Sequence, residues 1–210
     1  TRDVKLSTSD EHYIRINALT RFSSASNEKT GHLDFSYGKK EWGILSSISF
    51  SDFGDLRMGR TGDEFYEQPY YVRVDPTKDT VLTNGDKSLQ VGSGYSQVNM
   101  MQKFRFRPSE TIDLNYAFHY SRSSDVPRYD RLVEMKSGLP KYAEWYYGPT
   151  EWMMHHVSAE LADSTPFFDN LRITMAYQSY TESRHDRKLN SESIRERTEN
   201  LDITSVNIDA

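Results

Sequence analysis

Apolar and polar residues alternate along several stretches of this chain, most regularly between residues 112 and 120. A β-strand directs successive side chains to opposite faces. This stretch therefore predicts a strand with one apolar face and one polar face. The apolar face carries Ile112, Leu114, Tyr116, Phe118 and Tyr120, and the polar face carries Asp113, Asn115, Ala117 and His119.

The same alternation predicts further strands at about 12–23, 31–38, 42–50, 95–107, 152–161 and 171–178, with one more beginning near 201. The strand at 152–161 is the weakest, because His155 shares a face with Val157, Ala159 and Leu161. A bulge close to His155 is one way in which that strand could switch faces.

The connections between these strands alternate between short and long. Short turns are predicted at 38–41, 108–110 and 163–169, the last with Pro166, and a polar turn at 24–30. Long polar breaks are predicted at about 52–94, 121–150 and 181–198. Tight turns at one end and long loops at the other are typical of bacterial outer-membrane barrels. The chain is thus expected to be all-β, an antiparallel up-and-down meander of about eight strands forming part of a transmembrane barrel. Its apolar faces would meet lipid, and its long loops would be extracellular.

Composition is compatible with this expectation. The 210 residues are 36% hydrophobic and 27% charged, and no window approaches the roughly 18 apolar residues of a transmembrane helix. The aromatic share of 13% fits rings of aromatic residues at two membrane interfaces. Cysteine is absent, which excludes disulfides and thiolate metal sites, and the net charge of −5 argues against nucleic acid. Because the chain starts at Thr1 and shows no signal peptide, it is interpreted as an internal piece of a longer exported protein.

Four segments, 51–59 (SDFGDLRMG), 125–132 (DVPRYDRL), 143–149 (AEWYYGP) and 182–187 (ESRHDR), are similar to barrel strands and loops of TonB-dependent outer-membrane receptors, particularly the Bacteroidetes type. The resemblance implies a barrel of about 22 strands with an N-terminal plug domain in a Gram-negative outer membrane. Residues 1–210 would then be a partial barrel domain, without the plug and the remaining strands.

The resemblance also implies a function: active uptake of a scarce nutrient, energised by the TonB complex through the plug. The nutrient could be an iron chelate, haem, a vitamin, or an oligosaccharide or peptide, and a surface lipoprotein is a further candidate partner. A passive porin or a structural barrel would share the alternation and is the alternative. No nucleophile, base and acid arrangement, phosphate loop or paired-carboxylate motif is present, so no enzymatic activity and no cofactor are expected.

Aromatic residues gather in the second long break. Exposed loop aromatics often mark recognition, although packing among the loops themselves would use the same residues. The candidate ligand-binding residues, all in the long breaks, are Arg128, Tyr129, Tyr142, Trp145, Tyr146, Tyr147 and His185.

Metal binding is not favoured at either place that invites it. In the run Met153-Met154-His155-His156 the two imidazoles would point to opposite faces of a strand, so they could not share one metal. The acids of the first long break lack an EF-hand spacing, and a solvated loop is the better interpretation; they are Asp63, Glu64, Glu67, Asp75, Asp79 and Asp86. The lone histidines His119 and His185 are each interpreted as a solvated side chain rather than a metal ligand.

Overall fold

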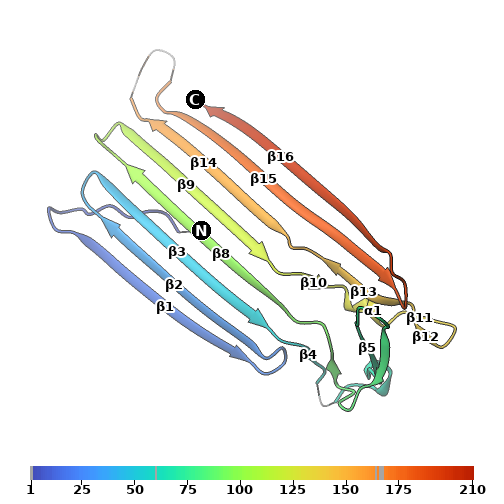
Figure 1. Cartoon of the computed structure of the whole chain (residues 1–210). Helices are drawn as coiled ribbons and strands as arrows, with labels where there is room; N and C mark the ends of the chain where they lie inside the picture. Colours follow the sequence, from blue (N-terminus) through green and yellow to red (C-terminus); the bar gives the residue numbers. More distant parts are fainter. Residues whose placement is uncertain (1, 60, 164, 166–167) are drawn as a thin grey trace.

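The structure is a computed structural model that describes residues 2–59, 61–163, 165 and 168–210. Its dominant feature is a sheet of eight long strands that run side by side (Figure 1). The long strands are β1 (Tyr13–Ser23), β2 (Glu28–Gly38), β3 (Trp42–Phe53), β8 (Tyr95–Phe106), β9 (Ile112–Ser123), β14 (Glu151–Leu161), β15 (Leu171–Lys188) and β16 (Ile194–Asp209).

The long strands pair antiparallel in the order β1-β2-β3-β8-β9-β14-β15-β16, each with its sequence neighbour among them. The sheet is open, with β1 and β16 at its two edges. The β2–β3, β8–β9 and β14–β15 connections lie at one end, and the β3–β8 and β9–β14 loops lie at the other (Figure 1). The predicted all-β meander and the parity of its turns are confirmed.

Pairing across the sheet confirms the predicted faces. Directly paired residues on adjacent strands share a face, and one row of partners is hydrophobic on all eight strands. The row is Ile14, Tyr37, Ile44, Phe104, Tyr116, Val157, Met175 and Val206. We call this side the apolar face. The opposite side, the polar face, has the corresponding row of Arg15, Ser36, Leu45, Lys103, Ala117, His156, Ala176 and Ser205.

The predicted loop at 181–198 is wrong for most of its length, because β15 and β16 continue as a paired ribbon and only 189–193 connects them. Charged residues lie along both strands here, with Asp186 opposite Arg195 but Glu182 opposite Glu199 and Arg184 opposite Arg197, so other ion pairs are diagonal. Arg195 donates two hydrogen bonds of 2.8 Å to Asp186, and Arg184 lies 3.3 Å from Glu199. The stretch looked like a polar loop because neither face of the ribbon is apolar.

The two long loops contain secondary structure of their own, which the polar breaks in the sequence did not predict. The first loop holds β4 (Leu56–Arg57), a 3₁₀ turn η1 (Glu64–Tyr66), the hairpin β5 (Tyr70–Arg73) with β6 (Thr80–Thr83), and β7 (Leu89–Gln90). The second holds β10 (Val126–Pro127), α1 (Tyr129–Leu132), β11 (Met135–Lys136), β12 (Leu139–Pro140) and β13 (Tyr142–Tyr147). β13 pairs with the extended part of β15, and β10 pairs with β13.

The segment before β1 lies on the polar face near the short-turn end. Lys103 Nζ donates to the carbonyl of Arg2 at 2.7 Å, and the Arg105 guanidinium donates to the carbonyl of Val4 at 3.2 Å. Val4 and Leu45, 3% and 2% exposed, lie in this covered region. Gly43 permits the close approach, because a Cβ there would lie 2.8 Å from Val4 Cγ1. Part of the polar face is thus covered by the chain itself.

The predicted turn at 163–169 lies between β14 and β15, but Pro166 and residues 164 and 167 lie outside the described residues. Helix is scarce in the part of the chain that the structure describes, and none of it is long and apolar enough to cross a membrane.

Candidate ligand-binding site

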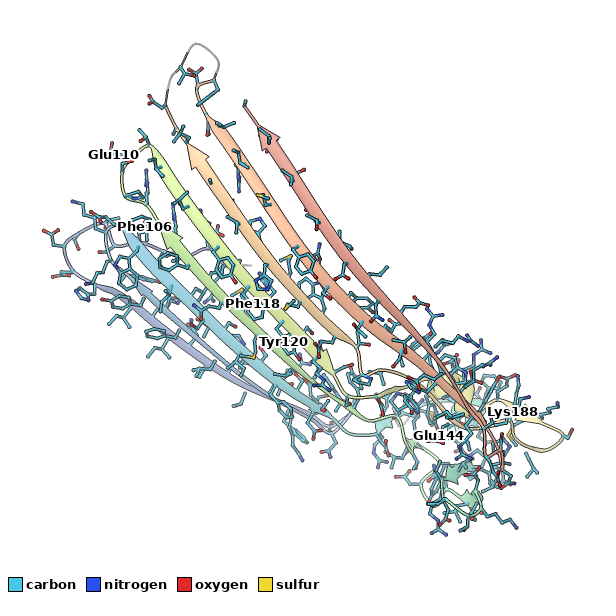
Figure 2. All side chains as sticks on the ribbon, turned by 45° about the horizontal axis from the view of Figure 1, so that its top comes forward. Phe106, Glu110, Phe118, Tyr120, Glu144 and Lys188 are labelled. Atoms are coloured by element: carbon cyan, nitrogen blue, oxygen red, sulfur yellow. The ribbon has the colours of Figure 1, made fainter. Side chains whose placement is uncertain are left out.

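The seven candidate residues all lie at the long-loop end of the sheet. Figure 2 shows this end around the labelled Glu144 and Lys188, far from Phe106 and Glu110 at the short-turn end. Here the second long loop returns to the sheet as β13, beside the extended part of β15, and α1 packs against β13.

An extra residue sets the direction in which the β13 side chains point. Glu151 pairs with Thr181 and Tyr147 pairs with Arg184, so three residues, 148–150, lie opposite two residues of β15. Gly148 occupies this bulge with a φ of +113°, a conformation that favours glycine. The bulge predicted near His155 is therefore misplaced, because pairing is continuous over Glu151–Leu161.

Tyr147 pairs with Arg184, and Trp145 pairs with Asp186. Both aromatic side chains therefore lie on the same side as the polar face, where they contact Arg128. The Arg128 guanidinium lies 4.9 Å from the Trp145 ring centroid and 5.6 Å from that of Tyr147, and it donates to the Tyr147 hydroxyl at 3.0 Å. Hydrogen bonds to Asp130 and Tyr147 raise the pKa of Arg128. This stack is an ordered cationic and aromatic surface that needs no ligand to hold it.

Tyr146 pairs with His185 and lies on the other side of β13. The two rings are stacked, with centroids 4.6 Å apart and planes 9° from parallel. His185 Nε2 lies 2.8 Å from Ser183 Oγ, so the imidazole is held at both its ring face and its edge. The seven candidates are thus divided between two surfaces.

A cavity of about 220 Å³ lies between the two long loops. Its aromatic wall comes from β5, α1 and β13: Tyr70, Tyr71, Tyr129, Tyr142, Trp145 and Tyr146. Val72, Val74, Leu132 and Val133 add aliphatic surface. The structure therefore brings Tyr129, Tyr142, Trp145 and Tyr146 to one hollow, while the side chains of Arg128, Tyr147 and His185 lie outside its lining.

An ion-pair network that the sequence did not predict holds the first loop in place. Arg187 on β15 donates two hydrogen bonds of 2.8 Å to Asp79 and also pairs with Glu144 on β13. The backbone N–H of Asn190 donates to Asp79 at 2.7 Å. These contacts hold the pKa of Asp79 below its usual value, despite the opposing effect of burial.

The expectation that the acids of the first loop are solvated is thus wrong for Asp79, whose side chain is 1% exposed. Asp86 pairs with Arg57 at 2.5 Å, and Asp63 accepts a hydrogen bond from the backbone of Phe65. No local sequence signal distinguishes Asp79 from the other acids of this loop. Its partner Arg187 is more than 100 residues away in the chain, whereas the nearby Asp75 makes only local turn contacts with Thr77.

His155 and His156 point to opposite faces as predicted, whereas the prediction that His119 and His185 are solvated is wrong, because His119 is partly buried and His185 is stacked on Tyr146. His155 pairs with Phe118 and Tyr177 on the apolar face, and His156 pairs with Ala117 and Ala176 on the polar face. His119 lies on the polar face, half-buried near Trp152. Within the described ranges, no three His, Asp or Glu side chains form a group that could hold a metal ion.

Comparison with protein-family models, with curated proteins and with solved structures gives no match for this chain.

Proposed function

We propose that this chain forms part of the wall of an outer-membrane β-barrel receptor that binds a nutrient at its extracellular end and imports it with energy from the TonB complex. The observation that carries the proposal is the division of the sheet into two faces. One row of side chains is hydrophobic on all eight long strands, and large residues of the apolar face such as Ile16 and Phe50 are more than half exposed. A folded chain in water rarely leaves such a continuous apolar surface uncovered.

The height of the apolar face fits a bilayer. On β9 it extends from Ile112 to Tyr120. This stretch of nine residues is within the roughly 9–11 residues that a tilted transmembrane β-strand needs. In the proposed orientation Phe106 lies at the periplasmic end, and Phe118 and Tyr120 lie farther toward the loops (Figure 2).

The covered polar face supports a receptor rather than an open pore. In a barrel the polar face lines the lumen, and the segment at 2–7 lies across it, bound by Lys103 and Arg105. A passive porin needs an open aqueous path, whereas a gated receptor keeps its lumen occupied. The loop end supports the same proposal, since the loops form an ordered aromatic hollow rather than a solvated fringe.

Two measurements on the complete protein test this function. Inserted into planar bilayers, a receptor with an occupied lumen should give no steady conductance, whereas a porin should give stepwise open channels. In cells, uptake of its nutrient should stop when the TonB relay is deleted. Stable open channels together with relay-independent uptake would show a passive pore instead.

A loop variant tests where the ligand binds. Replacing Tyr142, Trp145, Tyr146 and Tyr147 by Ala should weaken ligand binding and leave membrane insertion intact, because these residues lie beyond the proposed lipid-facing band. Insertion is measured by heat-modifiable migration on gels, and binding by uptake of the nutrient at limiting concentration. Undiminished uptake by the inserted variant would place recognition elsewhere.

A further inference from the structure

Tyrosines contribute much of the wall of the cavity between the long loops. These tyrosines come from three separate elements: Tyr70 from β5, Tyr129 from α1 and Tyr146 from β13. The Tyr146 ring is fixed in orientation by its stack on His185. The volume of the cavity, about 220 Å³, exceeds the roughly 150 Å³ of a cavity that holds one benzene molecule. The hollow therefore has room for one small ring or one branched polar group.

The charged groups at the cavity are all acidic. Asp125 and Glu144 line it, and the lining includes no Lys, Arg or His. Glu144 is paired with Arg187, whereas Asp125 makes no ion pair or side-chain hydrogen bond within the part of the chain that the structure describes. Asp125 is also exposed.

The tyrosines respond to this negative environment. Burial, reinforced by the charge of Asp55, raises the pKa of Tyr129 to about 12. Burial also raises the pKa of Tyr146, with Asp125 and Glu144 adding to the effect. Each nearby carboxylate disfavours a second negative charge in the hollow. An anionic ligand group would meet the same repulsion.

We propose that this cavity binds an organic cation, an alkylammonium or guanidinium group, held against the faces of Tyr129 and Tyr146 and paired with the carboxylate of Asp125. Aromatic faces attract cations through the ring quadrupole, and sets of such faces recognise ammonium groups in other proteins. A carboxylate beside the rings adds a charge-assisted hydrogen bond. Phosphates, carboxylates and other anionic groups should bind in the hollow more weakly than such a cation.

The cation could belong to a basic side chain of a peptide or to a free quaternary amine, and both share this chemistry. That the cation is part of the imported nutrient rests on the proposed function. Binding of the cation in the cavity does not rest on it, because the loops form the hollow whether or not the barrel transports anything.

The test uses the complete protein in detergent and two pairs of probes matched in shape but differing in charge. N-acetyl-arginine amide is compared with the neutral N-acetyl-citrulline amide, and choline with the neutral 3,3-dimethylbutan-1-ol. Binding is measured by titration calorimetry. We expect the cation of at least one pair to bind about tenfold or more tightly than its neutral partner. The pair that shows the preference identifies a peptide side chain or a free amine as the source.

Two variants with matched controls localise the effect. Asp125→Asn should weaken the cation about tenfold and leave the neutral probe unchanged, whereas Glu64→Gln, the same charge change outside the cavity lining, should alter neither. Tyr129→Leu should weaken the cation, and Tyr129→Phe, which keeps the ring, should not.

Equal affinity for the cationic and neutral probes, tighter binding of the neutral probe, or no binding of any probe would overturn the proposal. So would a cation preference that survives both Asp125→Asn and Tyr129→Leu. The titrations test the cation site, and the bilayer and TonB experiments test transport. The two sets of results are independent, so a passive pore with a cation site can be distinguished from a receptor without one.

Discussion

Removing the carboxylate of Asp79 tests whether one buried ion pair docks the first long loop on the sheet. Asp79 accepts three hydrogen bonds, two from Arg187 and one from the backbone of Asn190, and its side chain is 1% exposed. Removing one partner of a buried pair costs about 3–5 kcal/mol. Arg187 keeps its contacts to Glu144 and to the Ser191 carbonyl, which favours the lower end, about 3 kcal/mol.

Asp79→Ala should therefore raise the open population of the β5–β6 hairpin about 100-fold, since about 1.4 kcal/mol corresponds to a factor of ten. Hydrogen exchange of the backbone amides at 70–83 measures the free energy of this opening. The control is Asp86→Ala, which breaks a pair with Arg57 whose side chains are 46% and 48% exposed. Exposed pairs contribute about 0–1 kcal/mol, so exchange should change less than tenfold. Similar exchange in the two variants would refute the assignment of Asp79 as the anchor.

The same ion pair predicts a pH dependence of loop docking. The pKa of Asp79 is lowered by its hydrogen bonds from Arg187, so the docked state holds the charged carboxylate more favourably than the undocked state does. This stabilisation is complete above the undocked pKa, about 3.9, and is lost as the pH falls through the lower docked pKa. The protection of the amides at 70–83, measured relative to exchange from the unfolded chain, should be constant from pH 5 to 8 and should decrease below about pH 4. A midpoint near pH 6 would show that another group controls docking.

Three further changes test the orientation of the sheet and the covered polar face. Leu114→Lys, one row from the centre of the apolar face, should cost about 2 kcal/mol in folding titrations with lipid vesicles, while Asn115→Lys on the polar face should cost little; equal costs would mean that the faces are misassigned. Cysteine introduced by Gly85→Cys should react on intact cells with a membrane-impermeant reagent, and cysteine from Lys40→Cys should not, whereas the reverse labelling would invert the topology. Gly43→Ala should displace the segment at 2–7, costing about 1–3 kcal/mol, and make that segment sensitive to protease; unchanged resistance would show that the segment is held by other contacts.

The sheet could be predicted from the sequence because its signal is local. Where one face is apolar, as from Ile112 to Tyr120, alternation marks both the strand and the side of each residue. Where β15 and β16 extend beyond the apolar face, both sides are charged and the alternation disappears. The pairing of Asp186 with Arg195 becomes visible only when the two strands lie side by side.

The candidate site could be predicted only in part. Its aromatic residues stand out in composition, and four of the seven line one cavity. Which of them point to the polar-face side and which to the other side depends on the extra residue at 148–150, because this residue shifts the pairing of β13 with β15 by one position. The ion pair of Asp79 with Arg187 depends on how a long loop folds back on the sheet, and no spacing rule encodes such a contact.

The meander order also sets how the chain can assemble. Each long strand pairs with the long strand next to it in sequence, so most hairpins close over connections of a few residues, such as 39–41 between β2 and β3. The exceptions are β3 with β8 and β9 with β14, whose pairings must close the loops at 54–94 and 124–150. Loop-closure entropy grows with the logarithm of length and makes each of these closures about 2 kcal/mol less favourable than that of a three-residue turn. We therefore expect β1–β3, β8–β9 and β14–β16 to form as three separate nuclei, whose joining at the β3–β8 and β9–β14 seams limits the folding rate.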